Sequence, residues 1–144
     1  MRKIISIIGK PNAERTARLN ALRRVISIED LLQKQIDNHT IYQEWIERCR
    51  ESRKEIYDFV LINVMIAAIR KMAKEDETVV VTGFPQNAEQ VEALKLCKMH
   101  LKKIIVFEED VKRMSGEKRK KVREMIEEAR NSGTEVISLD KKGK

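Results

Sequence analysis

Short aliphatic runs, separated by longer segments with helical periodicity, are the feature of this chain that most restricts its fold. Residues 4–8, 78–82 and 104–107 are rich in Ile and Val, and residues 134–139 partly alternate between apolar and polar. Continuous Val/Ile runs bounded by turn residues are typical of strands buried on both faces, as in parallel sheets. With a further short strand at residues 25–27, the sequence predicts an α/β fold, a three-layer α/β/α domain with a parallel sheet of about five strands.

The segments between these runs have the spacing of helices. Residues 56–72 are apolar almost all round, which predicts a buried helix. Asn87 followed three residues later by Gln90 predicts a helix start, and residues 14–24 and 115–131 predict two further helices. Residues 29–54 predict one polar helix with apolar anchors at Leu31, Leu32, Ile36, Ile41, Trp45 and Cys49.

Length and composition indicate a single domain over residues 1–144. The chain is 42% apolar and 37% charged, which is enough to form a core and excludes disordered and low-complexity classes. Cys49 and Cys97 cannot make a disulfide framework, and no run approaches the ~20 apolar residues that cross a bilayer. Gly9-Lys10-Pro11-Asn12 stands where a signal peptide would be cleaved. We therefore expect a cytoplasmic protein that does not bind membranes.

The net charge of +7 permits binding to nucleotide, RNA or an acidic protein surface, and selects none of them. A basic run could contact RNA phosphates, but glutamates at helical spacing around it favour a solvated helix face. This run consists of Lys118, Arg119, Lys120 and Lys121.

Isolated side chains give weaker signals. Tyr42 and Trp45 lie on a polar segment, and residues of this kind either anchor a partner or cap the core. His39 and His100 have no partners at the spacing of a metal or catalytic site, so the sequence predicts no metal site.

The junction after the first strand has part of a phosphate-binding P-loop, G-x-x-x-x-G-K-[ST]. Gly9 and Thr16 match the first glycine and the final Ser/Thr of this motif, but Glu14 replaces the second glycine and Arg15 replaces the lysine. A side chain at position 14 crowds the backbone N–H groups that cradle a phosphate, and its carboxylate stands where the anion would sit. Taken alone, these residues favour a plain strand–helix turn in which Glu14 complements the dipole of its own helix.

A second motif is more specific. Gly83-Phe84-Pro85, Gln90 and Glu92-Ala93-Leu94 have the spacing of a signature that reads D-G-F-P-R-T followed by x-x-Q-A-E-A-L. Residues 26–32 are similar to an I-S-T-G-D-L-L segment, and residues 56–62 to a V-P-D-E-L-V-I segment, of the same family. Over roughly residues 1–110, the chain resembles the adenylate kinase family of nucleoside monophosphate kinases, whose fold is a three-layer α/β/α P-loop domain.

The resemblance implies two ligand sites. The nucleotide site would consist of Gly9, Arg15, Thr16 and Arg113. The monophosphate site would consist of Gly83, Phe84, Pro85 and Gln90. An active member of the family binds ATP with Mg²⁺ and transfers a phosphoryl group to a nucleoside monophosphate.

The departures from the family pattern fall where the family carries charge. Arg15 replaces the P-loop lysine of the family, and Thr82 replaces its magnesium-associated aspartate. Gln33 and Gln86 replace its two monophosphate arginines. The family's lid has no counterpart, because residues 110–116 leave room for only a short connection. Hydrogen bonds to charged groups contribute about 1.5–3 kcal/mol each, so losing two arginines removes about 3–6 kcal/mol of binding. That loss moves a micromolar site to millimolar or beyond.

A kept framework with lost charges predicts an adenylate-kinase-like pseudoenzyme that acts as a protein-interaction or structural module. Two alternatives stay open: a divergent active nucleoside monophosphate kinase that takes its missing arginines from a partner chain, and an RNA-associated accessory domain. We expect a protein partner before RNA, and weak or no nucleotide binding. ATP and Mg²⁺ are expected only if the kinase is active.

Overall fold

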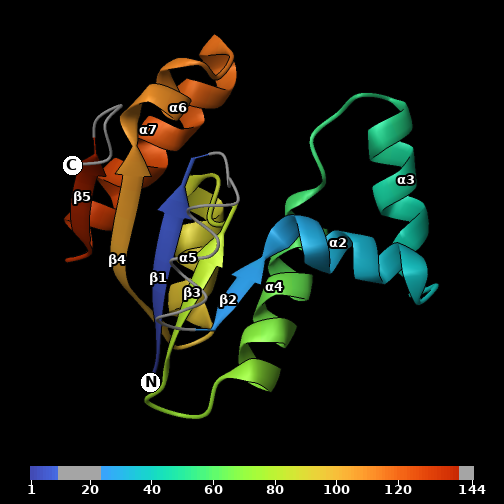
Figure 1. The fold of residues 1–144 in the computed structure, drawn as a ribbon, viewed down its shortest axis with the longest axis horizontal. Coiled ribbons are helices and arrows are strands. Elements are labelled where there is room, and N and C mark those ends of the chain that lie inside the picture. Colours follow the sequence, from blue (N-terminus) through green and yellow to red (C-terminus); the bar gives the residue numbers. More distant parts are fainter. Residues whose placement is uncertain (10–23, 140–144) are drawn as a thin grey trace.

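Five parallel strands form one sheet in the order β2-β3-β1-β4-β5 (Figure 1). The computed structural model describes residues 1–9 and 24–139. The strands are β1 (Arg2–Ile8), β2 (Val25–Ser27), β3 (Thr78–Thr82), β4 (Met99–Phe107) and β5 (Glu135–Leu139). The α/β class and the parallel sheet of five strands are as the sequence predicts.

Three of the helices cover one face of the sheet. The connections β2–β3, β3–β4 and β4–β5 advance in the same direction across the sheet, so right-handed crossovers place α4, α5 and α7 on the same side. α5 contacts both α4 and α7, whereas α2 and α3 extend beyond the β2 edge (Figure 1). The described helices are α2 (Ile28–Asp37), α3 (Gln43–Glu51), α4 (Asp58–Met72), α5 (Ala88–Leu96), α6 (Glu108–Lys112) and α7 (Gly116–Asn131).

The structure differs from the sequence predictions at three elements. The single helix predicted for residues 29–54 is two helices, because the chain turns between α2 and α3, where His39 has a φ of 51°. The turn changes the helical phase, so Ile46 is fully buried, whereas Ile41 and Trp45 are 81% and 43% exposed and do not anchor the core. β4 begins at Met99 rather than at residue 104, and α6 was not predicted. The helix predicted for residues 14–24 falls almost wholly outside the described residues.

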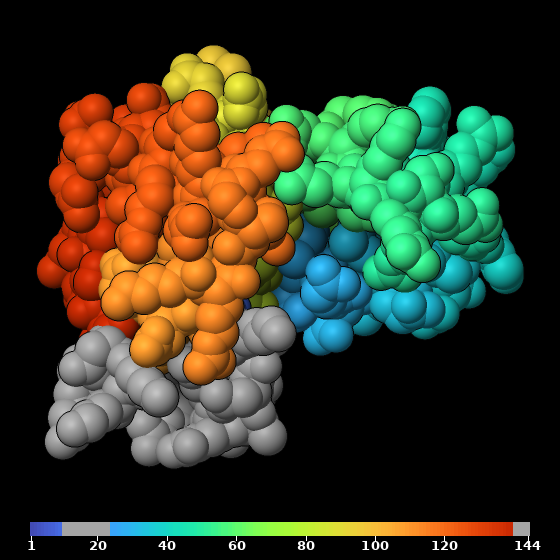
Figure 2. Space-filling model, turned by 90° about the horizontal axis from the view of Figure 1, so that it is seen from above, coloured from blue at the N-terminus to red at the C-terminus, as the bar shows by residue number. Residues whose placement is uncertain are grey.

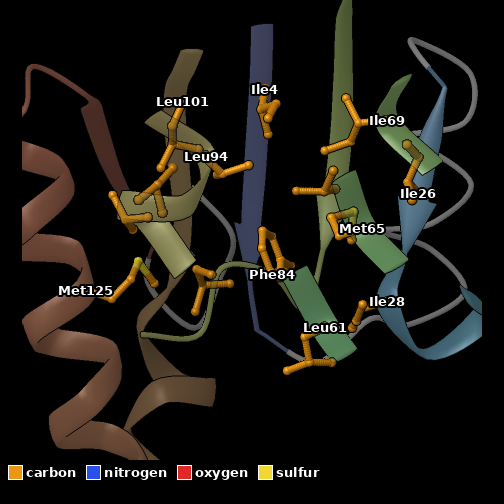
Figure 3. Close-up of a cluster of buried hydrophobic side chains, with 14 of the residues drawn as sticks. Ile4, Ile26, Ile28, Leu61, Met65, Ile69, Phe84, Leu94, Leu101 and Met125 are labelled. Carbon is orange, nitrogen blue, oxygen red and sulfur yellow. The ribbon is translucent and has the colours of Figure 1, made fainter. Parts of the chain in front are cut away.

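The core lies between the sheet and the helices on its covered face (Figure 3). α4 contributes Val60, Leu61, Val64, Met65, Ile66 and Ile69, which confirms the predicted buried helix. Phe84, from the loop after β3, is fully buried and lies between β1 and α4 (Figure 3). Burying one such side chain stabilises the fold by about 1.5–3 kcal/mol. None of the helices within residues 1–9 and 24–139 is long and apolar enough to cross a bilayer.

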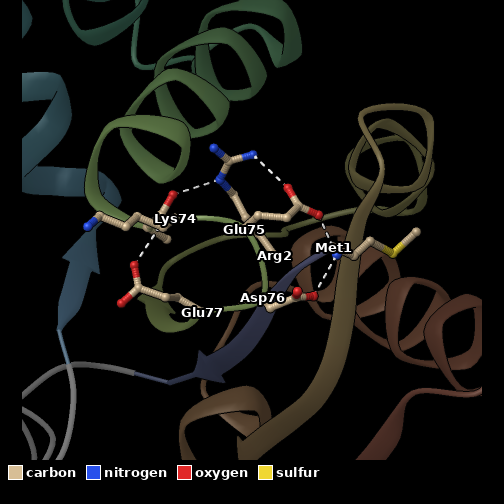
Figure 4. Close-up of polar contacts among 7 residues, drawn as sticks. Met1, Arg2, Lys74, Glu75, Asp76 and Glu77 are labelled. Atoms are coloured by element: carbon tan, nitrogen blue, oxygen red, sulfur yellow. Dashed lines mark hydrogen bonds and ion pairs between the residues drawn. The ribbon is translucent and has the colours of Figure 1, made fainter.

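The amino end of β1 is fixed to the turn between α4 and β3 (Figure 4). The ammonium group of Met1 contacts the carboxylates of Glu75 and Asp76, and the guanidinium Nε of Arg2 donates a 2.7 Å hydrogen bond to the Ala73 carbonyl. Hydrogen bonds to the two carboxylates raise the pKa of the Met1 ammonium group, and the ammonium group in turn lowers the pKa of Asp76. These contacts hold the register of β1 at the end of the sheet opposite to the candidate site.

Candidate functional site

The carboxyl ends of the parallel strands meet at one edge of the sheet. β1 and β4 are neighbours, but the chain leaves β1 towards β2 on one side and leaves β4 towards β5 on the other. In open α/β sheets, ligands bind outside the carboxyl ends of the strands at such a switch point. Figure 2 looks onto this edge and shows a depression between the orange α6–α7 corner and the blue-to-green α2 and α3.

Gly9 lies at the end of β1, where a P-loop would begin. Its φ is 145°, and a Cβ there would lie 2.8 Å from the Oδ2 atom of Asp110 and 3.0 Å from the Cβ atom of Phe107, so a larger residue would be strained and would require its neighbours to shift. The Asp110 side chain therefore lies against the backbone at the end of β1. The other predicted P-loop residues, Arg15 and Thr16, lie outside the described residues.

The loop after β3 is held close to β1 and α2. Gly83 has a φ of 77°, and a Cβ at this position would overlap the Cγ2 atom of Ile28. The buried Ser6 hydroxyl donates a 2.6 Å hydrogen bond to the Phe84 carbonyl, and the Gln86 side-chain amide donates one of 2.9 Å to the Gly83 carbonyl. The Gly83-Phe84-Pro85 motif thus forms a compact loop, with Phe84 and Pro85 buried.

Side-chain amides after this loop bind one another and a carboxylate on α4. The Nδ2 atom of Asn87 and the Nε2 atom of Gln90 donate hydrogen bonds of 2.8 and 3.0 Å to the Oδ1 atom of Asp58. The Gln86 backbone N–H donates to the Oε1 atom of Gln90 at 2.7 Å, and the Gln90 N–H donates to the Asn87 Oδ1 atom, which caps α5 as predicted. Gln90 has no exposed surface. We call Asp58, Gln86, Asn87 and Gln90 the amide network.

Sequence reasoning assigned Gln90 to the monophosphate site and gave no role to Asp58. The signal for Asp58 was available, because it is a lone carboxylate at the start of an apolar helix. In the structure this carboxylate accepts hydrogen bonds from two α5-side amides. No buried side-chain nitrogen or oxygen among the described residues lacks a partner, so the amide network is internally satisfied.

Arg123 of α7 is bound to Glu108 at the start of α6. Two hydrogen bonds, of 2.8 and 3.3 Å, join the guanidinium to the two carboxylate oxygens. The bonds from Arg123 are the main reason why the pKa of Glu108 is lowered, and a hydrogen bond from Ser138 adds to this effect. Arg113, which the resemblance placed on the ATP base, is exposed and follows the last residue of α6.

Replacing Arg123 by Gln should lower stability in a pH-dependent way. A carboxyl group whose folded-state pKa is depressed stabilises the fold above its unfolded pKa, and this stabilisation is lost as the pH falls through the folded pKa. Both side chains are partly exposed, so we expect a loss below about 1 kcal/mol at about pH 7 that fades towards about pH 3. Urea unfolding at the two pH values measures it. Arg130→Gln, at the other end of α7, is the matched control, and an Arg123→Gln effect that does not change with pH would contradict the prediction.

Three exposed aromatic rings from α3 and the start of α4 pack together. Trp45 meets Tyr57 and Phe59 edge-on, with ring centroids 5.8 and 5.4 Å apart, and the Tyr57 and Phe59 rings are stacked at 6.0 Å. The three side chains are 43–45% exposed. We call Trp45, Tyr57 and Phe59 the aromatic cluster. Sequence reasoning singled out Trp45 but missed its two partners, and it paired Trp45 with Tyr42, which is partly buried against the core.

The basic run lies on the first turns of α7. Lys118, Arg119 and Lys120 are exposed, and Lys121 contacts the carboxylates of Glu55 at 3.3 Å and Glu117 at 3.8 Å. With the end of α6, the run forms a surface that we call the basic corner: Lys112, Arg113, Lys118, Arg119, Lys120 and Lys121.

Metal-ligating side chains do not gather within the described part of the chain. No three His, Cys, Asp or Glu residues there could hold a metal ion together. His39 and His100 are exposed and belong to different parts of the fold, as expected for surface histidines. Comparison with known proteins found no family model and no curated protein that matches this chain.

Proposed function

We propose that this protein is an adenylate-kinase-like domain that does not transfer phosphoryl groups and works as a binding module. The amide network carries the proposal. In the family that the sequence resembles, the residues after Gly-Phe-Pro face a monophosphate with positive charge. Here Gln86 stands in place of the arginine, is neutral and donates its side-chain amide to the Gly83 carbonyl, while the retained Gln90 is hydrogen-bonded to the Gln86 N–H and to Asp58.

The charges at the carboxyl edge support the same proposal. Phosphoryl transfer is catalysed almost entirely by positioning and by stabilisation of negative charge. At this edge, the guanidinium of Arg123 is bound to the carboxylate of Glu108. This pairing takes up a positive charge that could otherwise meet a triphosphate.

The aromatic cluster supports a binding role. Contiguous exposed apolar surface on a folded domain marks interaction sites, and Trp and Tyr are enriched among residues that dominate binding energy. Trp45, Tyr57 and Phe59 keep almost half of their surface in water although they pack against one another. The protein partner expected from the sequence stays a prediction.

Purified protein should not turn over ATP and AMP in a coupled assay. ATP and AMP at about 0.05 mM, with MgCl₂, should also leave its melting temperature unchanged, because a ligand stabilises the fold only when its concentration is comparable to its Kd, and we expect a Kd in the millimolar range or above. An active adenylate kinase serves as the positive control for both measurements. Turnover of several per second that Arg15→Ala abolishes would overturn the proposal in favour of a divergent kinase.

A further inference from the structure

We propose that the aromatic cluster and the basic corner together form a binding site for single-stranded nucleic acid. The inference rests on the proposed function and names the partner of that binding module. Its starting observation is the contact between the Nζ atom of Lys121 and the Oε2 atom of Glu55, 3.3 Å apart, which joins α7 to the segment before α4.

This contact makes the two surfaces neighbours. Residues 54–57 belong to no helix or strand, and Ile56 is half-buried against the core while Glu55 and Tyr57 are exposed on either side of it. Tyr57, a member of the aromatic cluster, is thus exposed two residues along the chain from the side chain that Lys121 reaches. Figure 2 shows the orange α7 region meeting the green α3–α4 region across the top of the depression.

The charge of the basic corner points to a polyanion. Residues 112–123 contain seven basic residues and one acidic residue, Glu117. Three of the carboxylates beside this stretch are paired: Glu55 and Glu117 contact Lys121, and Glu108 contacts Arg123. No ion pair joins Lys112, Arg113, Lys118 or Lys120 to another described residue, so these cations are available to phosphates.

Aromatic rings beside the cations favour single strands. Proteins bind single-stranded nucleic acid by combining a basic surface that follows the phosphates with aromatic side chains on which bases stack. A duplex keeps its bases stacked on one another and cannot offer them to Trp45 or Tyr57. An acidic protein surface would meet the same cations, but it would offer the rings no bases to stack on.

Trp45 is the only tryptophan of the chain, so its fluorescence reports on the site directly. An unlabelled 12-nucleotide oligouridylate in about 50 mM NaCl should quench the emission of Trp45 in a saturable way. The affinity should fall linearly with the logarithm of the salt concentration. A duplex of the same length should quench less than one-tenth as much, and so should uridine monophosphate.

Two sets of variants test the two halves of the site. Lys118→Glu with Lys120→Glu should weaken binding at least tenfold and reduce the salt dependence. The matched control is Lys71→Glu with Lys74→Glu, which makes the same change in net charge at exposed positions near the end of α4. It should change the affinity less than twofold. Tyr57→Leu should weaken binding about fivefold or more, because stacking contributes about 1–3 kcal/mol per base. Leu96→Ala, at an exposed apolar position on α5, should have no effect.

The outcomes separate this inference from the proposed function. No quenching by the oligouridylate, equal quenching by uridine monophosphate, or binding that the Lys118/Lys120 and Tyr57 variants leave intact would overturn the nucleic-acid site. An acidic peptide that quenches Trp45 where the oligouridylate does not would also overturn it, in favour of a protein partner. Phosphoryl transfer in the coupled assay would overturn the proposed function alone.

Discussion

Gly83→Ala should lower the free energy of unfolding by about 2–5 kcal/mol. The φ of Gly83 is 77°, and this left-handed region costs a residue with a Cβ about 1–2 kcal/mol. The added methyl group would also overlap the Cγ2 atom of Ile28, and overpacking costs about 1–3 kcal/mol more. Urea unfolding of the two proteins at one temperature measures the difference.

Gly133→Ala is the matched control for this prediction. The φ of Gly133 is 93°, but nothing lies within 4 Å of a Cβ at that position. It should therefore show only the conformational cost of about 1–2 kcal/mol. In a double-mutant cycle, Ile28→Ala should relieve about 1–3 kcal/mol of the cost of Gly83→Ala. Equal costs at the two glycines, together with strict additivity at Ile28, would show that α2 does not approach the Gly83 loop as closely as the structure indicates.

Local signals in the sequence were sufficient for most of the fold. The strand at 78–82 and the short strand at 25–27 have the predicted bounds, because Val and Ile runs between turn residues depend on nearest neighbours only. The helix starts at Asn87 and Ser115 were also predictable, since each side chain accepts a hydrogen bond from an N–H three residues later.

Features that depend on distant contacts were not predictable in this way. The break at His39 puts a non-glycine residue at a φ of 51°, which is uncommon even though His tolerates it better than most residues, and it decides that Ile46 rather than Trp45 is buried. The extension of β4 to Met99 depends on its pairing with Arg2 of β1. A stretch in which apolar and polar residues alternate forms a strand only when a neighbouring strand pairs with it, and the sequence does not show which strand that is.

At the candidate site too, local motifs were predictable from the sequence and contacts between distant residues were not. The resemblance found the Gly83 loop and Gln90 from a short linear motif. It could not show that Gln90 would bind Asp58, 32 residues earlier, or that Trp45 would meet Phe59. The first contact forms because α4 and α5 pack together, and the second because the chain returns from α3 to the start of α4, and only the folded chain determines either arrangement.

Gln90→Leu should lower the free energy of unfolding by about 2–4 kcal/mol. The substitution keeps the approximate size of the fully buried side chain. It removes the acceptor for the Gln86 N–H and one of the donors to Asp58, and a buried polar group left without a partner costs about 1–3 kcal/mol. Urea unfolding measures the loss, and Leu96→Ala at an exposed position of the same helix should cost less than about 0.5 kcal/mol.

Gln90→Glu turns the same position into a pH-dependent one. As a neutral acid, the new side chain can still donate to Asp58 and accept from the Gln86 N–H, but once ionised it places a second carboxylate in a buried site. Burial and the Asp58 carboxylate therefore raise the pKa of the introduced group above its unfolded value. A group of this kind leaves the fold most stable at low pH, and stability is lost as the pH rises through the raised pKa. The free energy of unfolding of the variant should be close to that of the original protein at about pH 4 and lower by more than about 2 kcal/mol at about pH 7.

Gln33→Glu is the matched control. Gln33 also donates to a carboxylate, that of Asp37, but it lies on an exposed helix face where water solvates the new charge. If Gln90→Glu is no more pH-sensitive than Gln33→Glu, the amide network is open to water, and the carboxyl edge is better suited to ligands than we propose.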